Sequence, residues 1–303
     1  MTGYEQTPAV IQPQKRHFRF RTIFLPLLFL AVHWLTINVT ATLYVIFYAL
    51  LHSQILNPLD LLSQQELVNQ LLINHYPVIS VIYSCLLIPI YSIYLGIQKK
   101  QDSQAIWLEK PHIHELSAAI AITIGLLGII NIWFNILMTL SESNPLINRW
   151  MKEYYESTAA FGADIGYLWL ILGISIMTPI AEELLFRGII QGELRKAMPE
   201  WAAIIVQGLV FAAFHWQPIQ VSYVLLPGLA LGLVYALTRS IWAPIIMHIT
   251  FNFLGSVLPA LIGEDEVLNQ ILGVSELSFI LIGALSLIYL DRISRDRRQA
   301  RVT

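Results

Sequence analysis

Long apolar blocks dominate this chain of 303 residues and restrict the folds that it can adopt. Hydrophobic residues make up 56% of the chain and charged residues only 13%. Soluble domains average about 25% charged residues. Because lipid offers no hydrogen bonds to the backbone, apolar blocks of about 20 residues cross a membrane as helices. The sequence therefore predicts an all-α membrane protein, a polytopic bundle of about eight transmembrane helices. The eight expected spans are Ile23–Leu50, Tyr76–Ile97, Leu116–Leu140, Ile165–Ala197, Trp201–Trp216, Val221–Thr238, Ile241–Leu258 and Ile271–Leu290.

The distribution of Lys and Arg supports this number of spans. In an eight-span arrangement, fifteen of the 18 basic residues fall on one side of the membrane. Only Arg149 and Lys152 fall on the other side, and Arg187 lies within a span. Basic residues concentrate in cytoplasmic loops, so both termini are expected in the cytoplasm. The fifteen residues are Lys15, Arg16, Arg19, Arg21, Lys99, Lys100, Lys110, Arg195, Lys196, Arg239, Arg292, Arg295, Arg297, Arg298 and Arg301.

The chain is expected to form one membrane domain with a short basic arm at each end. Residues 1–22 form the N-terminal arm, residues 23–290 the transmembrane domain and residues 291–303 the C-terminal tail. The first apolar run is longer than the 7–15 residues of the apolar h-region in a signal peptide, so it is expected to be retained. The single cysteine, Cys85, lies in an apolar run and is expected to be a small packing residue. The chain length and the basic arms fit a bacterial plasma-membrane protein.

Two carboxylates and a guanidinium interrupt the fourth expected span. Glu182, Glu183 and Arg187 lie among apolar residues, and Pro179 precedes them by one turn. Ionisable groups are costly in hydrocarbon and indicate a functional site. Glu183 and Arg187 are four residues apart on one helix face, so we expect them to form an ion pair. Glu182 projects about 100° away and is the carboxylate left to act as a general base. The alternative is a structural Glu–Arg bridge with a second glutamate facing water.

Two later spans each contribute further polar residues. His215 lies near the end of the fifth span, four residues after Phe211. His248 lies in the seventh span, with Asn252 four residues later on the same face. Either histidine alone could be a packing residue, and Asn252 could join two helices by a hydrogen bond. Together with the glutamates, these groups are the ingredients of water-activating chemistry, and we expect Glu182, His215 and His248 to share one pocket.

These three motifs resemble the signature of the CAAX-protease and bacteriocin-processing family. The family comprises intramembrane endopeptidases, including the type II CAAX prenyl proteases. The motifs Glu182-Glu183-x-x-x-Arg187, Phe211-x-x-x-His215 and His248-x-x-x-Asn252 occur in the family's order, and the resemblance covers a catalytic core of about residues 165–252.

The resemblance implies a role for each motif residue. Glu182 would activate a water molecule, with Glu183 and Arg187 supporting it and Phe211 completing the second motif. His215 would hold or polarise the water, and His248 and Asn252 would stabilise the oxyanion of the tetrahedral intermediate. The expected substrate is a peptide or protein at the bilayer, including lipid-anchored ones.

The sequence leaves the cofactor open. Glu182, His215 and His248 are the candidate ligands of a zinc ion, because Glu and His both ligate zinc. No His-Glu-x-x-His motif is present, and we favour a glutamate-activated water. The His112-Ile113-His114-Glu115 cluster is expected to be only the entry to a helix.

Other classes of function are weaker fits. A transporter or channel with a charged midplane site is one alternative, although a second, matching half with a broken helix is not evident. A non-catalytic member of the same fold is another. The net charge of -2 gives no argument for a nucleic-acid partner.

Overall fold

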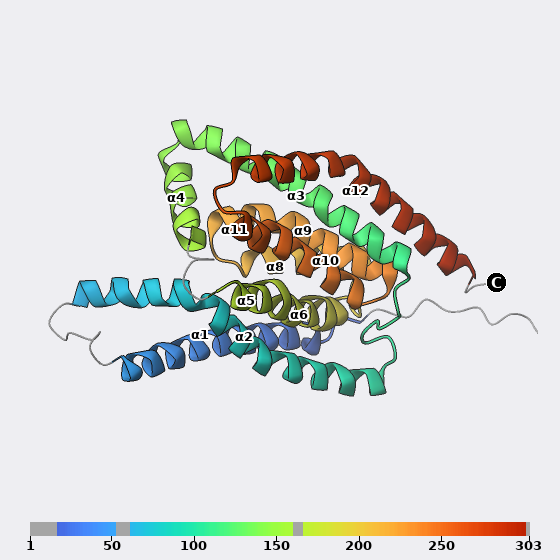
Figure 1. The fold of residues 1–303 in the computed structure, drawn as a ribbon. Coiled ribbons are helices and arrows are strands. Elements are labelled where there is room, and N and C mark those ends of the chain that lie inside the picture. Colours follow the sequence, from blue (N-terminus) through green and yellow to red (C-terminus); the bar gives the residue numbers. More distant parts are fainter. Residues whose placement is uncertain (1–16, 53–60, 160–165, 301–303) are drawn as a thin grey trace, which may run out of the picture.

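The computed structural model describes residues 17–52, 61–159 and 166–300. Within this part of the chain it consists of helices and their connections (Figure 1). This confirms the all-α membrane bundle predicted from the apolar blocks. Parts of the two arms lie outside the described residues, including Lys15, Arg16 and Arg301. The helical elements are α1 (Phe20–Leu51), α2 (Leu61–Gln101), α3 (Ile113–Ser143), α4 (Pro145–Ala159), α5 (Tyr167–Leu170), η1 (Ile171–Met177), α6 (Thr178–Glu183), η2 (Leu184–Gln191), α7 (Gly192–Leu194), α8 (Glu200–Ala213), α9 (Pro218–Thr238), α10 (Trp242–Asn252), η3 (Phe253–Val257), α11 (Leu258–Ile262) and α12 (Glu266–Ala300).

Seven helical stretches of the described chain are long and apolar enough to cross a membrane. They correspond to seven of the eight expected spans. The fifth expected span, Trp201–Trp216, is the exception, because α8 has only 14 residues. Pro199 caps its start, and Trp216 adopts a left-handed backbone with a φ of 60° just after its end. A full crossing needs about 20 residues, so this helix is too short to cross the membrane by itself.

The bundle has an outer helix pair on each side and the site helices between them. In Figure 1, α3 and α12 run side by side along one face, and α1 and α2 lie along the opposite face. Helices α3 and α12 approach closely because glycines line their contact. A Cβ on Gly125 would lie 2.7 Å from the carbonyl oxygen of Phe279, and one on Gly283 would lie 3.1 Å from that of Ala121. Small residues at such contacts are typical of membrane helix pairs.

Helix α4 was not predicted from the sequence. It connects α3 to the site helices and carries Arg149 and Lys152, each paired with a glutamate four residues later. Its charged face explains why the apolar runs did not reveal it. Cys85 is exposed on α2, so its expected packing role is wrong.

Basic side chains from distant helices meet at one end of the bundle. The eight-pass arrangement predicted from the sequence requires this. Arg21 pairs with Glu193, which also binds Lys196. Arg297 of α12 donates to the carbonyl of Thr238, at the end of α9. The side of the membrane that this end faces stays a prediction from the positive-inside rule.

Candidate active site within the bundle

The Glu pair lies on a short α-helix between two π-helical segments. Helix α6 begins at Thr178, with Pro179 in its first turn, and ends at Glu183. The π-helical segments η1 and η2 precede and follow it. A proline lacks the N–H group that a regular helix uses, and wider π turns often occur at functional sites. The long span that contains Pro179 thus changes helix type twice along its length, from η1 to α6 and from α6 to η2.

Glu183 is fully buried, and one of its carboxylate oxygens contacts both Arg187 and His248. Its Oε1 accepts a hydrogen bond from Arg187 Nη1 at 2.8 Å. The same atom lies 2.7 Å from Nδ1 of His248. The predicted ion pair between Glu183 and Arg187 is confirmed, with both side chains at 0% exposure. Its link to His248 on α10 was not foreseen from the sequence.

Arg187 ties the Glu pair to α8 and α9. Its Nη2 donates to the carbonyl oxygen of Gly228 at 2.9 Å, and its guanidinium lies 4.7 Å from the ring centroid of Phe211. Phe211 in turn contacts both imidazoles edge to face, with centroid distances of 4.9 Å to His215 and 5.8 Å to His248. Phe211 therefore fixes the position of both histidines and shields the buried ion pair.

Glu182 points away from this network and toward a cavity. Its side chain keeps 14% of its exposure, in contrast to the fully buried Glu183. Its Oε2 lies 3.7 Å from Nε2 of His248. This imidazole therefore lies between the two carboxylates, with Nδ1 on the structural one and Nε2 toward the accessible one. The division of roles between the two glutamates agrees with the helical geometry expected from the sequence.

His215 lies beyond the end of its helix, which corrects its predicted place within a span. Helix α8 ends at Ala213, and His215 lies in the turn that leads to α9. Its Nδ1 is 2.8 Å from the carbonyl oxygen of Phe211, which orients the ring. Because that bond engages Nδ1, the opposite ring nitrogen is the one available to the cavity.

Asn252 is held by a bond between two helices. Its Nδ2 donates to the carbonyl oxygen of Ile174 in η1 at 2.9 Å. A side-chain amide has two N–H donors, so one remains after this bond. The helix-joining role considered from the sequence is therefore present, and it leaves a donor for a second partner.

One cavity of about 990 Å³ brings the four proposed catalytic side chains together. Glu182, His215, His248 and Asn252 all line it, and so does Phe211. Its other lining residues come from most of the surrounding helical elements, among them α2, α3, α4, α9, η3 and α11, and many are aromatic or apolar. The pocket expected from the three motifs therefore exists in the structure.

Supporting residues outside the motifs were missed from the sequence. Gln207 of α8 donates to the carbonyl of Gly228, the same oxygen that accepts from Arg187. A Cβ on Gly228 would lie 2.8 Å from Cδ1 of Phe211, so a larger residue at this position would displace the Phe211 ring. A polar Gln207 in an apolar helix was the signal that could have revealed this contact.

The described residues do not form a three-ligand metal site. Nowhere in the part of the chain with described coordinates do three His, Cys, Asp or Glu side chains lie close enough to hold a metal ion together. The set Glu182, His215 and His248 shares the cavity but not a ligand cluster, and Glu183 already engages one nitrogen of His248. His112 is the N-cap residue just before α3, and its backbone N–H donates to Glu115, as expected of a helix entry.

The fold and this network define an integral membrane protein with a polar site inside its helical bundle. Residues 164–254 match the family model described as Type II CAAX prenyl endopeptidase Rce1-like. This match confirms the resemblance that the three motifs predicted, and it covers nearly the same residues as the expected catalytic core.

A curated bacterial protein is also similar to part of this chain. The chain is 31% identical over 83 residues to the Bacillus subtilis (strain 168) protein named "Putative membrane peptidase YdiL". That stretch is 27% of this chain and 34% of the relative, so the similarity spans about a third of the relative's length. No solved structure matches the chain.

Proposed function

We propose that this protein is an intramembrane endopeptidase that hydrolyses a peptide bond with a water activated by Glu182. The observation that carries the proposal is the unequal burial of two adjacent carboxylates. Glu183 is sequestered by Arg187 and His248, while Glu182 faces a cavity with His248 Nε2 at 3.7 Å. The match to the prenyl endopeptidase family and the relative's name support this class of reaction.

The residues of the cavity divide the hydrolysis into three tasks. Glu182 takes a proton from water as the water oxygen attacks the scissile carbonyl carbon. The free N–H of Asn252 and the N–H of His248 donate to the oxyanion, and the Glu183 carboxylate stabilises the positive charge of a protonated His248. As the C–N bond breaks, Glu182 returns the proton to the leaving amine. Preorganised donors of this kind are worth about 3–4 kcal/mol each in other enzymes.

His215 has a positioning role in this scheme. Its ring is fixed by the Phe211 carbonyl and by the Phe211 ring, and it lines the same cavity as Glu182. We assign it to hold the attacking water beside Glu182. No zinc-bound step is included, because the described side chains do not form a three-ligand set.

The position and lining of the cavity support a proposed class of substrate. It lies within the helical bundle, and its walls carry Tyr76, Tyr223 and Phe251 among other aromatic and apolar residues. Such a cavity fits a peptide segment that reaches the site from the bilayer, either as a helix end or next to a lipid anchor. We also propose that the protein lies in a bacterial plasma membrane with both termini in the cytoplasm. The orientation rests on the distribution of the basic residues.

Comparative membrane peptidomics tests the proposed reaction. Membranes that contain the wild-type chain are compared with membranes that contain Glu182→Gln, which keeps the side-chain size and removes the base. Loss of a general base is expected to lower cleavage about 10²–10⁴-fold. The matched control is Glu153→Gln, because Glu153 is an exposed glutamate of α4 that pairs with Arg149 and, among the described residues, does not line the cavity.

The result also separates the alternatives. Peptides that disappear with Glu182→Gln and persist with Glu153→Gln identify the cut bonds. A transporter would change solute uptake and leave the peptide pattern unchanged, and a non-catalytic member would change neither. Full cleavage by Glu182→Gln would overturn the proposal.

A further inference from the structure

A second cavity adjoins the proposed active site on the side of α3 and α12. Its volume is about 340 Å³, and α3, α4, α9, α12 and η3 all contribute to its walls. Several residues line both this cavity and the one that contains Glu182, among them Tyr154, Tyr223 and Ser256. The two cavities are therefore continuous, and a peptide bound at the active site can extend into the second one.

Only a short piece of peptide is needed to connect the two cavities. Asn252, the proposed oxyanion donor, lines the active-site cavity, whereas Ser256 and Pro259 line both. At the rise of a helix, these two residues lie about 6 and 10 Å beyond Asn252. An extended chain advances about 3.3 Å per residue. A residue two or three positions from a carbonyl group at Asn252 therefore reaches the second cavity.

Glu276 of α12 is the carboxylate that lines this second cavity. The residue is only 8% exposed, although α12 is the least buried of the candidate membrane spans. The close contact between α3 and α12 explains this burial, because a Cβ on Gly128 would overlap the carbonyl oxygen of Glu276. Ionisable side chains within membrane spans indicate a functional site, and the proposed hydrolysis does not use this one.

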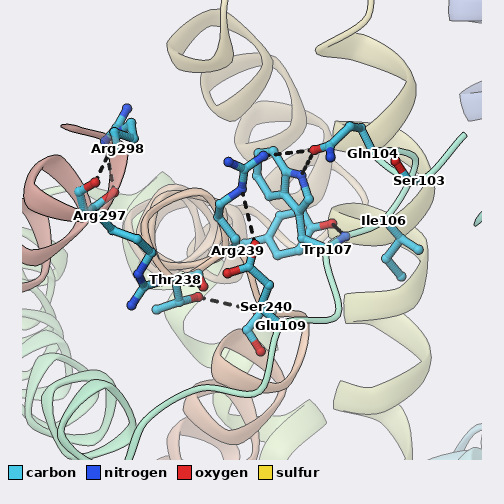
Figure 2. Close-up of polar contacts among 12 residues, drawn as sticks. Ser103, Gln104, Ile106, Trp107, Glu109, Thr238, Arg239, Ser240, Arg297 and Arg298 are labelled. Carbon is cyan, nitrogen blue, oxygen red and sulfur yellow. Dashed lines mark hydrogen bonds and ion pairs between the residues drawn. The ribbon is translucent and has the colours of Figure 1, made fainter. Parts of the chain in front are cut away.

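The other buried glutamates of the described chain all have cationic partners. The ion pairs are Glu183 with Arg187, Glu115 with Arg297, and Glu193 with both Arg21 and Lys196. Figure 2 shows that even the partly exposed Glu109 lies beside Arg239, with 3.8 Å between its Oε1 and the Arg239 Nε. Glu276 is the exception, because its partner among the described residues is the neutral amide of Asn131.

The hydrogen bond from Asn131 orients the Glu276 carboxylate but leaves its negative charge in place. Asn131 Oδ1 accepts from Nδ2 of Asn135 at 3.0 Å, so its own Nδ2 is the group that donates to Glu276. In the described chain, no Lys, Arg or His lines this cavity. A buried carboxylate without a cation is costly, so a cationic ligand in the cavity is strongly favoured.

The rest of the lining fits a long side chain with a charged end. Leu127 and Ile130 supply aliphatic surface, and Asn269 supplies a carbonyl acceptor. Tyr154 and Tyr155 supply aromatic rings, which attract cations. Lysine and arginine combine an apolar stem with a cationic end, so their side chains match both parts of this lining.

We propose that the second cavity is a specificity subsite for a lysine or arginine side chain of the peptide substrate. This inference rests on the peptidase activity proposed above. The cationic end of the side chain lies against the Glu276 carboxylate, and its stem packs on Leu127 and Ile130. The basic residue stands two or three positions from the bond that is cut beside Glu182 and Asn252.

Binding of two synthetic peptides tests the subsite without requiring cleavage. The peptides consist of leucine and alanine and differ at one central position, which is lysine in one and glutamine in the other. Both are offered to the full-length protein in detergent, with Glu182→Gln present so that neither is cut. The added variants are Glu276→Gln, which keeps an acceptor for Asn131, and the control Glu266→Gln. Glu266 is an exposed glutamate of the same helix and, in the described chain, lines neither cavity.

The expected binding pattern depends on the charge of Glu276. The lysine peptide should bind about tenfold more tightly than the glutamine peptide, which is the effect of one charge-assisted hydrogen bond. Glu276→Gln should abolish this difference by weakening only the binding of the lysine peptide. Unchanged binding of the glutamine peptide shows that the variant is folded. Glu266→Gln should leave both affinities unchanged.

Membrane peptidomics separates failure of the subsite from failure of the proposed reaction. Cuts made by the wild-type chain should lie two or three residues from a lysine or arginine. Glu276→Gln should lose these cuts, whereas Glu182→Gln should lose every cut. The absence of all cuts in wild-type membranes would reject the peptidase. Cuts without a basic residue nearby would reject only the subsite.

Four binding results would overturn the subsite. Equal affinities for the two peptides would show that no charge is recognised. Equal losses with Glu276→Gln and Glu266→Gln would indicate general surface charge. Displacement of the lysine peptide by phosphatidylethanolamine, but not by phosphatidylcholine, would assign the cavity to a lipid ammonium group. Loss of both peptides with Glu276→Gln, together with a lower melting temperature, would make Glu276 only a joint between α3 and α12.

Discussion

His248 Nδ1 and Glu183 Oε1 are 2.7 Å apart, and both side chains are buried. This contact joins α10 to the helix that carries the Glu pair. The same oxygen also accepts from Arg187 at 2.8 Å, so one carboxylate serves both a permanent cation and an imidazole. Glu183 is thus the structural member of the pair, and its loss should affect the fold as well as the activity.

Stability measurements should distinguish Glu183 from Glu182. Glu183→Gln leaves Arg187 charged and unpaired at 0% exposure, which typically costs about 3–5 kcal/mol. Glu182→Gln should change stability little, because its side chain is partly exposed and makes no ion pair with Arg187 in the structure. Thermal unfolding of the detergent-solubilised protein measures both. Equal losses for the two variants would contradict the division of roles.

Asn252 should affect catalysis more than folding. If its second N–H donates to the oxyanion, Asn252→Ala should lower kcat about 10²–10³-fold while KM changes little. The matched control is Ser175→Ala, because Ser175 also donates across helices, to the Ile249 carbonyl at 3.2 Å, but does not line the cavity. Cleavage kinetics on a peptide identified by peptidomics give both constants. A similar kcat in the two variants would assign Asn252 a purely structural role.

The spacing of the motifs predicted much of the site because the spans are helical. An i, i+4 pair must share a face, so the Glu183–Arg187 bridge and the separate direction of Glu182 followed from the sequence. Long apolar runs likewise gave seven of the spans, with the short α8 as the exception. These features depend on local geometry, which the sequence encodes directly.

Contacts between helices were harder to predict. The position of His215 beyond the end of α8 depends on how Pro218 starts the next helix, and the bond between His248 and Glu183 depends on how α10 packs against α6. Periodicity places a residue on a face but does not say which other helix that face meets. The amphipathic α4 escaped prediction for a related reason, because its apolar face is recognised only against its neighbours.

Metal removal should leave the activity intact. Glu182, His215 and His248 line the cavity, but in the described structure these three side chains do not lie close enough together to hold a metal ion. The water is therefore expected to be activated by the Glu182 carboxylate. Cleavage is measured before and after dialysis against a chelator, with a zinc peptidase treated in parallel as the control. Loss of cleavage with the chelator and its recovery with zinc would instead show a metal-dependent reaction.

Gly173 should be essential for placing the Glu pair. It lies in η1, the π-helical segment directly before α6, and packs against α2. A Cβ at this position would overlap the carbonyl oxygen of Pro77 and the hydroxyl of Ser80. Gly173→Ala must therefore push η1 away from α2, and overpacking of this kind costs about 1–3 kcal/mol. The displacement would also move α6, so cleavage should fall together with thermal stability.

Gly96→Ala is the matched control for this substitution. Gly96 lies in α2 itself, and a Cβ there would meet nothing within 4 Å. Replacing glycine by alanine at an open helical position is expected to stabilise the helix by about 0.5–1 kcal/mol. The two variants should therefore change the melting temperature in opposite directions, with cleavage lowered only by Gly173→Ala. Unchanged cleavage by Gly173→Ala would show that the contact between η1 and α2 does not set the position of Glu182.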